Sequence, residues 1–293
     1  MFKSGFVAIV GNPNAGKSSL INKIFSRKIS IVSDKVQTTR NMIRGVYTDD
    51  DSQIIFLDTP GFHKPHNKLQ VYMNDQIEHA LSAVDVVIYV VDAKYGFGKK
   101  EQVIINKIKD LNVNTICLIN KIDLLKQEQV VELVNQAQQL DLFQEIFAIS
   151  LKDTFNVELF LNDLKVLLPE GIALYPEDHL VDYTKEFYIE EIVREKINQV
   201  CFDEIPHSVA IKTKAIEEDE NGLSIFVDVY VHRDSQKGII IGRGGQNLKT
   251  IGKRSRLELK EFFNQPIYLD IHVKVKPNWV DNNSLLMDWG YND

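Results

Sequence analysis

The stretch Gly11-Asn12-Pro13-Asn14-Ala15-Gly16-Lys17-Ser18 directly follows the apolar run of residues 6–10. It matches the pattern G-x-x-x-x-G-K-[ST] in the order strand, loop and helix that this motif requires. Backbone N–H groups of the glycine loop can converge on phosphates, and the following helix directs its positive end to the same place. We predict phosphate contacts from Gly11, Asn12, Asn14, Ala15, Gly16, Lys17, Ser18 and Ser19. A glycine turn that merely precedes a helix is the plainer alternative.

Asp58-Thr59-Pro60-Gly61 follows another apolar run, residues 53–57. A carboxylate there can hold Mg²⁺ through water, together with the Ser18 hydroxyl, and the Gly61 N–H can contact a terminal phosphate. By itself this segment is better explained as a Pro-Gly turn. Its place downstream of Lys17 favours a loop that senses the terminal phosphate.

Asn120-Lys121-Ile122-Asp123 ends the apolar run of residues 115–119. The Asp123 carboxylate can accept hydrogen bonds from N1–H and N2–H₂ of guanine, a donor pair that adenine lacks. Asn120 would brace the loop, and the stem of Lys121 would lie against the base. After the next apolar run, Ser150-Leu151-Lys152 can offer a backbone N–H to the guanine O6. A polar loop tip is the alternative, but four such segments in this order predict GTP or GDP as the ligand.

The first part of the chain alternates short apolar runs with amphipathic ones, which predicts a mainly parallel sheet with helices on both faces. The segment 44–57 has three aspartates at its centre and predicts one antiparallel edge pair. We expect strands over residues 6–10, 44–47, 53–57, 84–91, 115–119 and 146–149, and helices from 17 and over 69–81, 100–111, 128–140 and 157–167.

The bulk composition is that of an ordinary globular protein, with 44% hydrophobic and 26% charged residues among 293. That length favours two domains.

The longest apolar stretch, residues 84–91, is less than half of the roughly 20 residues that cross a bilayer. Cys117 and Cys201 lie in apolar surroundings that suit reduced thiols. We therefore expect a cytoplasmic protein.

Charge is distributed unevenly along the chain. Residues 232–276 hold ten Lys and Arg against four Asp and Glu, a local charge of +6 in a chain of net charge −7. Such an asymmetry indicates a polyanionic partner near the C-terminal end. A solvated helix face is the alternative.

The segment Gly242-Arg243-Gly244-Gly245 lies within this basic region, between two predicted helical stretches. A bare G-x-x-G is weak evidence, and by itself it is better explained as a glycine cap between helices. The order helix, strand, strand, helix, G-x-x-G, helix, strand matches the type II K-homology (KH) domain, an RNA-binding module. Ile239, Ile241, Leu248 and Ile251 could form an apolar floor for bases. The predicted RNA contacts are Gly242, Arg243, Gly244, Gly245, Lys249, Lys253 and Arg254.

With these motifs the chain resembles the Era-type GTPases within the TrmE-Era-EngA group of the translation-factor class. The resemblance rests on the amino-acid sequence of the phosphate loop, on Gln37-Thr38-Thr39-Arg40 and on the segment 58–61, and it covers nearly the whole chain. It implies an α/β P-loop GTPase domain followed by an α+β type II KH domain. We expect a GTP-binding domain over residues 1–168, a linker over 169–184, a KH-type RNA-binding domain over 185–276 and a C-terminal tail over 277–293.

The resemblance also implies roles. Thr39 would join Ser18 and Asp58 at Mg²⁺ in the GTP state, and Lys17, Thr39, Gly61 and Asn14 would be the catalytic set. The partner would be the 3′ end of the small-subunit ribosomal RNA, in assembly of the small ribosomal subunit. Peripheral contact with the inner face of the cell membrane is implied by the family alone, and we expect a monomer.

Phe62 stands where Ras-like proteins carry a glutamine that orients the attacking water, so we expect slow intrinsic hydrolysis of GTP. Asn14 matches the loop asparagine that ligates K⁺ in related GTPases, which makes K⁺ a candidate cofactor. The alternative is that Asn14 only stabilises the turn. A different class of function, a signalling GTPase whose C-terminal domain docks a protein or the membrane surface, is also open.

Overall fold

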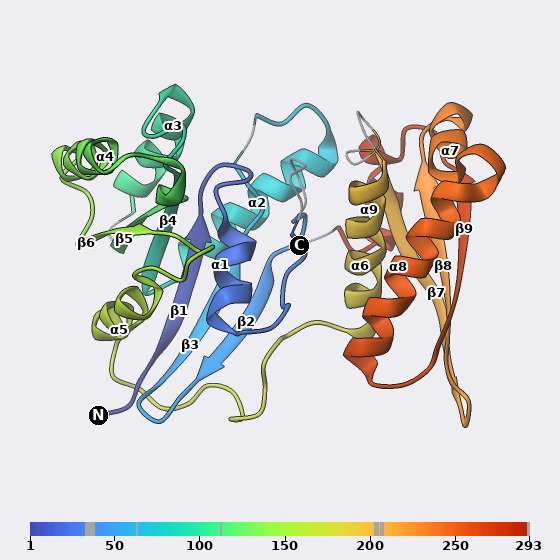
Figure 1. Ribbon diagram of the computed structural model, residues 1–293, viewed down its shortest axis with the longest axis horizontal. Helices are drawn as coiled ribbons and strands as arrows, with labels where there is room; N and C mark the ends of the chain where they lie inside the picture. The colour runs from blue at the N-terminus through green and yellow to red at the C-terminus, as the bar shows by residue number, and fades with distance from the viewer. Residues whose placement is uncertain (33–38, 63, 112, 202–204, 206–207, 292–293) are drawn as a thin grey trace. The chain divides into compact units, whose positions relative to one another are not determined.

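The chain folds into two units, described here from a computed structural model that covers residues 1–32, 39–62, 64–111, 113–201, 205 and 208–291. The first unit holds residues 1–30, 39–65 and 73–182, and the C-terminal part of the chain from Tyr183 belongs to the second (Figure 1). The predicted Gln37 and Thr38 lie outside the described residues.

The first unit is built on a six-stranded sheet of order β2-β3-β1-β4-β5-β6. β2 pairs antiparallel with β3, and all other neighbours are parallel. The six predicted strands and the antiparallel edge are therefore confirmed. The strands are β1 (Lys3–Val10), β2 (Ile43–Thr48), β3 (Ser52–Asp58), β4 (Val86–Asp92), β5 (Asn114–Asn120) and β6 (Glu145–Ile149).

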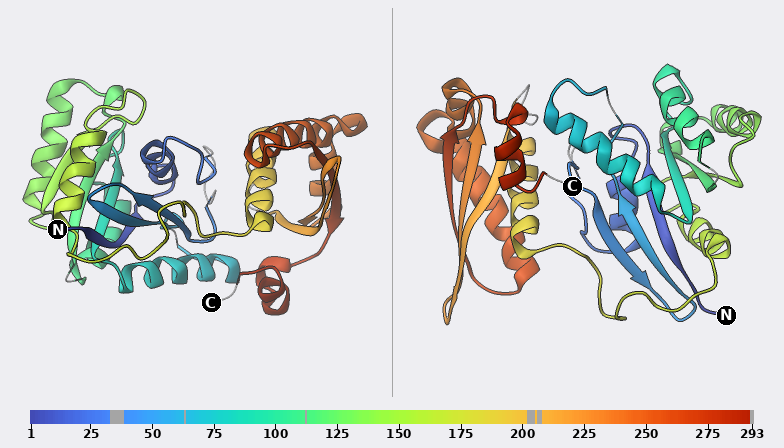
Figure 2. Two further views of the ribbon diagram at one scale, coloured as in Figure 1. Left: turned by 90° about the horizontal axis from the view of Figure 1, so that it is seen from below. Right: turned by 180° about the vertical axis from the view of Figure 1, so that it is seen from behind.

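Helices cover both faces of this sheet (Figure 2). On one face Ile77, Ile104 and Ala137 pack from α2, α3 and α4 into a core shared with β1, β3, β4 and β5. On the other face α5 sets Phe160 edge-on against Phe147 of β6. The helices are α1 (Lys17–Ile24), α2 (Lys68–Ser82), α3 (Lys99–Lys109), α4 (Gln127–Gln139) and α5 (Val157–Leu167), with a short 3-10 turn, η1 (Ile122–Leu124).

The second unit has a three-stranded sheet of order β7-β8-β9, in which β8 pairs antiparallel with β7 and parallel with β9. Ile192 of α6 and Leu259 of α8 pack with Ile225 of β8 in one core. The order of elements is the one predicted for a type II KH domain. They are α6 (Lys185–Val200), β7 (Ala210–Asp219), β8 (Gly222–Val231), α7 (Asp234–Ile241), η3 (Arg243–Gly245), α8 (Gln246–Phe263) and β9 (Ile267–Val275).

Residues after β9 form η4 (Trp279–Asp281) and α9 (Asn283–Asp288), two elements that the sequence analysis did not anticipate. Trp279 is fully buried and donates its indole N–H to the Ser208 carbonyl at 3.2 Å. Trp289 stacks on Tyr230 of β8, with 4.5 Å between ring centroids. Trp279 and Trp289 thus pack these elements onto the second unit.

Both cysteines are buried and free, as expected for core thiols. Burial raises the pKa of Cys201 to about 11, so its reactive thiolate is disfavoured. In the part of the chain that the structure describes, no helix has both the length and the apolar character needed to cross a membrane.

Candidate nucleotide and RNA sites

The nucleotide-site residues predicted from the sequence lie in loops that follow β1, β3, β5 and β6. These four strands run parallel, so their carboxyl ends meet at one edge of the sheet. That edge is where open α/β sheets bind ligands. The topology therefore brings segments distant in the sequence to a common place.

The loop after β1 is tied to the loop after β5. The Asn120 side-chain amide donates to the Ala15 carbonyl at 2.9 Å. Gly16 begins α1 with a φ of 108°, and a Cβ there would lie 2.2 Å from Asn120 Nδ2. Glycine is required at position 16 by both the backbone conformation and this close approach.

Lys17 points back into the phosphate loop, where its Nζ donates to the carbonyls of Gly11 and Asn12 at 3.1 Å each. Burial lowers the pKa of Lys17 to about 8, although the nearby carboxylates of Asp58 and Glu101 partly oppose that shift. The negative charge of a bound phosphate would further favour the charged form of this buried lysine.

Ser18, Thr39 and Asp58, the predicted Mg²⁺ set, lie close together. The hydroxyls of Ser18 and Thr39 are 3.1 Å apart. Asp58 is fully buried, and neither carboxylate oxygen has a hydrogen-bond partner of normal geometry among the described residues. Burial raises the pKa of Asp58, whereas Lys17 and the hydroxyls of Ser18 and Ser30 lower it by less. An oxygen-rich group with an unsatisfied buried carboxylate fits a hard divalent cation such as Mg²⁺.

The loop after β3 lies against the phosphate loop. Thr59 donates its hydroxyl to the Ile9 carbonyl at 2.7 Å. A Cβ at Gly61 would come within 2.7 Å of the Pro13 ring, so the backbone of one loop touches the other. Phe62 is buried in the core with α2 and α3 and cannot orient a water molecule.

The Asn-Lys-x-Asp loop holds its lysine firmly. Lys121 has a left-handed backbone (φ 68°), and its Nζ donates to the Asn14 carbonyl at 2.7 Å and to Asp92 Oδ2 at 2.6 Å. The Ser150 hydroxyl lies 3.1 Å from both Asp123 Oδ1 and Asp153 Oδ2. Asp123 itself is exposed, and the Ser150 hydroxyl contacts one of its two carboxylate oxygens.

The sequence analysis did not identify two acidic residues of this region. Asp92 is the last residue of β4, and an acidic residue at the end of an apolar run could have indicated it as a member of the site. Asp153 lies three residues beyond Ser150 in a turn, and no pattern marked it. Among the weaker predicted members, Leu151 is partly buried, Lys152 is exposed and Ser19 is a partly buried residue of α1.

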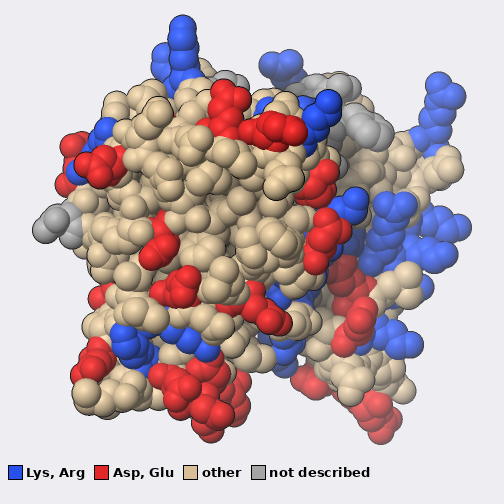
Figure 3. Space-filling view, turned by 60° about the vertical axis from the view of Figure 1, so that its left-hand side comes forward, with Lys and Arg blue, Asp and Glu red and all other residues tan. Residues whose placement is uncertain are grey.

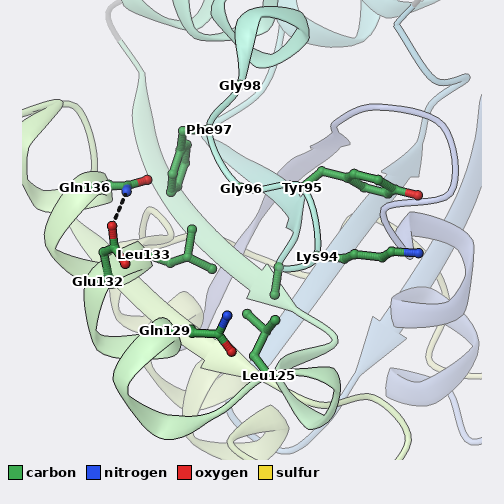
Figure 4. Close-up of a pocket in the computed structure, with 11 residues that line it drawn as sticks. Lys94, Tyr95, Gly96, Phe97, Gly98, Leu125, Gln129, Glu132, Leu133 and Gln136 are labelled. Atoms are coloured by element: carbon green, nitrogen blue, oxygen red, sulfur yellow. Dashed lines mark hydrogen bonds between the residues drawn. The ribbon is translucent and has the colours of Figure 1, made fainter.

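A separate pocket of about 400 Å³ lies between residues 93–98 and α4 (Figure 4). Phe97, Leu125 and Leu133 line it, and the Gln136 amide donates to Glu132 at 3.4 Å on its rim. None of the predicted nucleotide-site residues lines this pocket. The nucleotide site predicted from the sequence is therefore separate from this cavity.

In the second unit the G-x-x-G segment forms η3 between α7 and α8. Gly244 and Gly245 have φ values of 58° and 78°, and a Cβ at either would meet no atom within 4 Å. The backbone is thus open to an approaching ligand. Asn247 steadies the loop by donating its amide to the Ile239 carbonyl at 2.8 Å.

The basic side chains predicted for RNA lie on the surface, since Arg243, Lys249, Lys253 and Arg254 are all exposed. Lys and Arg gather at the right-hand edge of the view in Figure 3, whereas Asp and Glu are prominent in its lower part. The expectation that Ile251 forms an apolar floor is wrong, because Ile251 is completely buried in the core of the unit. Ile239 is 43% exposed and remains available.

Family comparisons agree with this division. Residues 6–121 match the family described as 50S ribosome-binding GTPase, and residues 204–280 match the KH domain. Fold and loop geometry together define a P-loop GTPase that carries a KH domain.

Two solved structures are similar over the full length of both chains. A variant of Era from Aquifex aeolicus bound to GDP·AlF4⁻ has 37% identity and a TM-score of 0.96. Era in complex with MgGDPNP and nucleotides 1506–1542 of 16S ribosomal RNA has 37% identity and a TM-score of 0.97. The chain belongs to the Era family of GTPases, which confirms the resemblance seen in the sequence.

Replacing Asp123 by Asn should shift the preference of the protein from GTP toward xanthosine triphosphate, because the amide can donate to the O2 that replaces the guanine amino group. Loss of a charge-assisted hydrogen bond predicts GTP binding about tenfold weaker or more. Fluorescence titration with both nucleotides measures the change. Asp153→Asn is the matched control, since it alters the other carboxylate beside Ser150 and should leave GTP preferred. Equal nucleotide preferences in the two variants would contradict the assignment of Asp123.

Affinity for GTP should fall as the pH rises above about 8, the pKa of Lys17 before nucleotide binds. Phosphate binds the charged lysine, so above that pH binding must take up a proton, and the decline of the association constant approaches about tenfold per pH unit. Titrations between pH 7 and 9 measure this slope. Lys17→Met should bind weakly with little slope in that range, and an equal slope in this variant would assign the titration to another group.

Proposed function

We propose that the protein is a GTP-timed switch that binds the 3′ end of small-subunit ribosomal RNA and acts in assembly of the small ribosomal subunit. The observation that carries the proposal is the full-length similarity to Era in complex with MgGDPNP and nucleotides 1506–1542 of 16S ribosomal RNA. Both modules required for such a switch occur in this chain, in the same order as in that relative.

In this proposal the nucleotide lies across the four loops of the first unit. Backbone N–H groups of residues 11–16 and Lys17 bind the phosphates, while Asp123 and Ser150 orient toward the guanine. Ser18, Thr39 and Asp58 would hold Mg²⁺, which neutralises charge on the phosphates when bound. The buried, unpartnered oxygens of Asp58 support that placement.

Hydrolysis converts GTP and water to GDP and phosphate, and we propose that it is slow without an added electrostatic element. Phe62 supplies no hydrogen bond to water because it is buried among apolar side chains. K⁺ near Asn14 is the candidate element, and it would act as an arginine finger does in other GTPases. Asn14 has a φ of 64°, and its carbonyl is held by Lys121, so the residue sits in a fixed turn of the phosphate loop.

RNA would bind along the G-x-x-G loop and the first half of α8. The open backbone at Gly244 and Gly245 allows close approach of a nucleic-acid backbone, and Arg243, Lys249, Lys253 and Arg254 supply positive charge. Cytoplasmic location, a monomeric state and peripheral contact with the inner face of the membrane stay predictions of the sequence analysis.

Changing Arg243 and Gly244 together to Asp should weaken binding of an RNA with the sequence of nucleotides 1506–1542 by about tenfold or more, because the change adds repulsion and a side chain at the open loop. Filter binding with the full-length chain at fixed salt measures this. Lys214→Asp, at an exposed position on β7, is the control and should bind nearly as wild type. Undiminished binding by the double variant would favour the alternative of a domain that docks a protein or the membrane surface.

GTP hydrolysis by the full-length chain should be faster in KCl than in NaCl at equal ionic strength, by about tenfold or more if the cation replaces an arginine finger. Asn14→Ala should remove the difference when both rates are measured at saturating GTP. Equal rates in the two salts for the wild-type protein would eliminate the K⁺ proposal.

A further inference from the structure

Glu101 is a buried carboxylate in the first turn of α3, and the phosphate-binding motif does not contain it. Its exposed fraction is 6%. Its backbone N–H donates to the Gly98 carbonyl at 3.0 Å, so the start of α3 fixes where the side chain begins. A buried carboxylate without hydrogen-bond partners would lower the stability of the folded chain, so the partners of Glu101 are needed to keep it buried.

The two oxygens of Glu101 receive one hydrogen bond each, from different elements. Oε1 accepts from the Asn12 side-chain amide in the phosphate loop. Oε2 accepts from the Tyr89 hydroxyl of β4, and Tyr89 is itself completely buried. Glu101 thus connects a central strand, a helix and the phosphate loop at a single side chain.

Asn12 sits where this connection affects the geometry of the loop. Its carbonyl accepts from Lys17 Nζ at 3.1 Å and from the Ala15 backbone N–H at 3.3 Å. A side chain held by Glu101 restricts rotation of the residue whose peptide closes the turn of residues 12–15. The opposite side of the same loop is held independently, by Lys121 at the Asn14 carbonyl.

We propose that Glu101 is a positioning residue for phosphate binding, which acts through the Asn12 side chain to hold the phosphate loop in the conformation that receives the nucleotide. Preorganisation of this kind strengthens binding, because less of the loop must be ordered when the nucleotide binds. Differences in affinity among variants of one site fall mostly on the rate of release, so the loss of this contact should speed release. The inference rests on the proposed placement of the phosphates at residues 11–18. It extends the nucleotide site to α3.

The test compares release of labelled GDP from full-length variants in the presence of Mg²⁺. Glu101→Gln and Asn12→Ala should each speed release by about tenfold, the effect of losing a charge-assisted hydrogen bond. The double variant should be no faster than the faster single variant, because both changes remove the same interaction. Glu128→Gln makes the same chemical change at an exposed position in the first turn of α4 and should release GDP as wild type does.

A purely structural role for Glu101 gives a different pattern. Tyr89→Phe removes only the other hydrogen bond of Glu101, and it should lower the melting temperature with little change in the release rate. Equal acceleration by Tyr89→Phe and Glu101→Gln, multiplicative effects in the double variant, or a wild-type rate for Asn12→Ala would each overturn the inference. A wild-type release rate for Asn12→Ala overturns the inference even where Glu101→Gln fails to fold. A wild-type chain that binds no GTP would refute the proposed function instead.

Discussion

Convergence of loops at the carboxyl edge of the parallel sheet is the constraint on which the nucleotide site depends. The hydrogen bond from Asn120 to the Ala15 carbonyl joins the ends of β1 and β5 across 105 positions of sequence. It requires glycine at position 16, because a larger residue would collide with the Asn120 amide. The loop proposed to bind the phosphates and the loop proposed to bind the base are therefore geometrically coupled.

Further hydrogen bonds between side chains stabilise those loops. Asp92 fixes the ammonium of Lys121, Ser150 fixes the carboxylate of Asp123, and Glu101 fixes Asn12. In each case a polar side chain at the end of a strand or the start of a helix restrains a residue assigned to the nucleotide. The result is a set of donors and acceptors that hydrogen bonds hold in place, which suits a reaction that depends on positioning more than on covalent chemistry.

Local sequence patterns predicted the fold, and they named most of the residues that the structure brings together at the candidate site. The phosphate loop and the Asn-Lys-x-Asp segment carry their chemistry in consecutive residues, and strand ends were visible from apolar runs. Glu101 and Asp153 were not recognisable, because their importance comes from partners that only the folded chain brings close. Ile251 was misplaced because an apolar residue on an amphipathic helix can face either a groove or the core. The helix α9 was missed because its six residues are too short for a periodic pattern.

The buried carboxylate of Asp58 affects the stability of the folded chain. A charged group kept from water without full compensation makes the folded chain less stable than its core alone would allow. A cation and a nucleotide that bind only the folded form recover this loss by mass action. Resistance to proteolysis should accordingly be greater when guanine nucleotide and a divalent cation are bound.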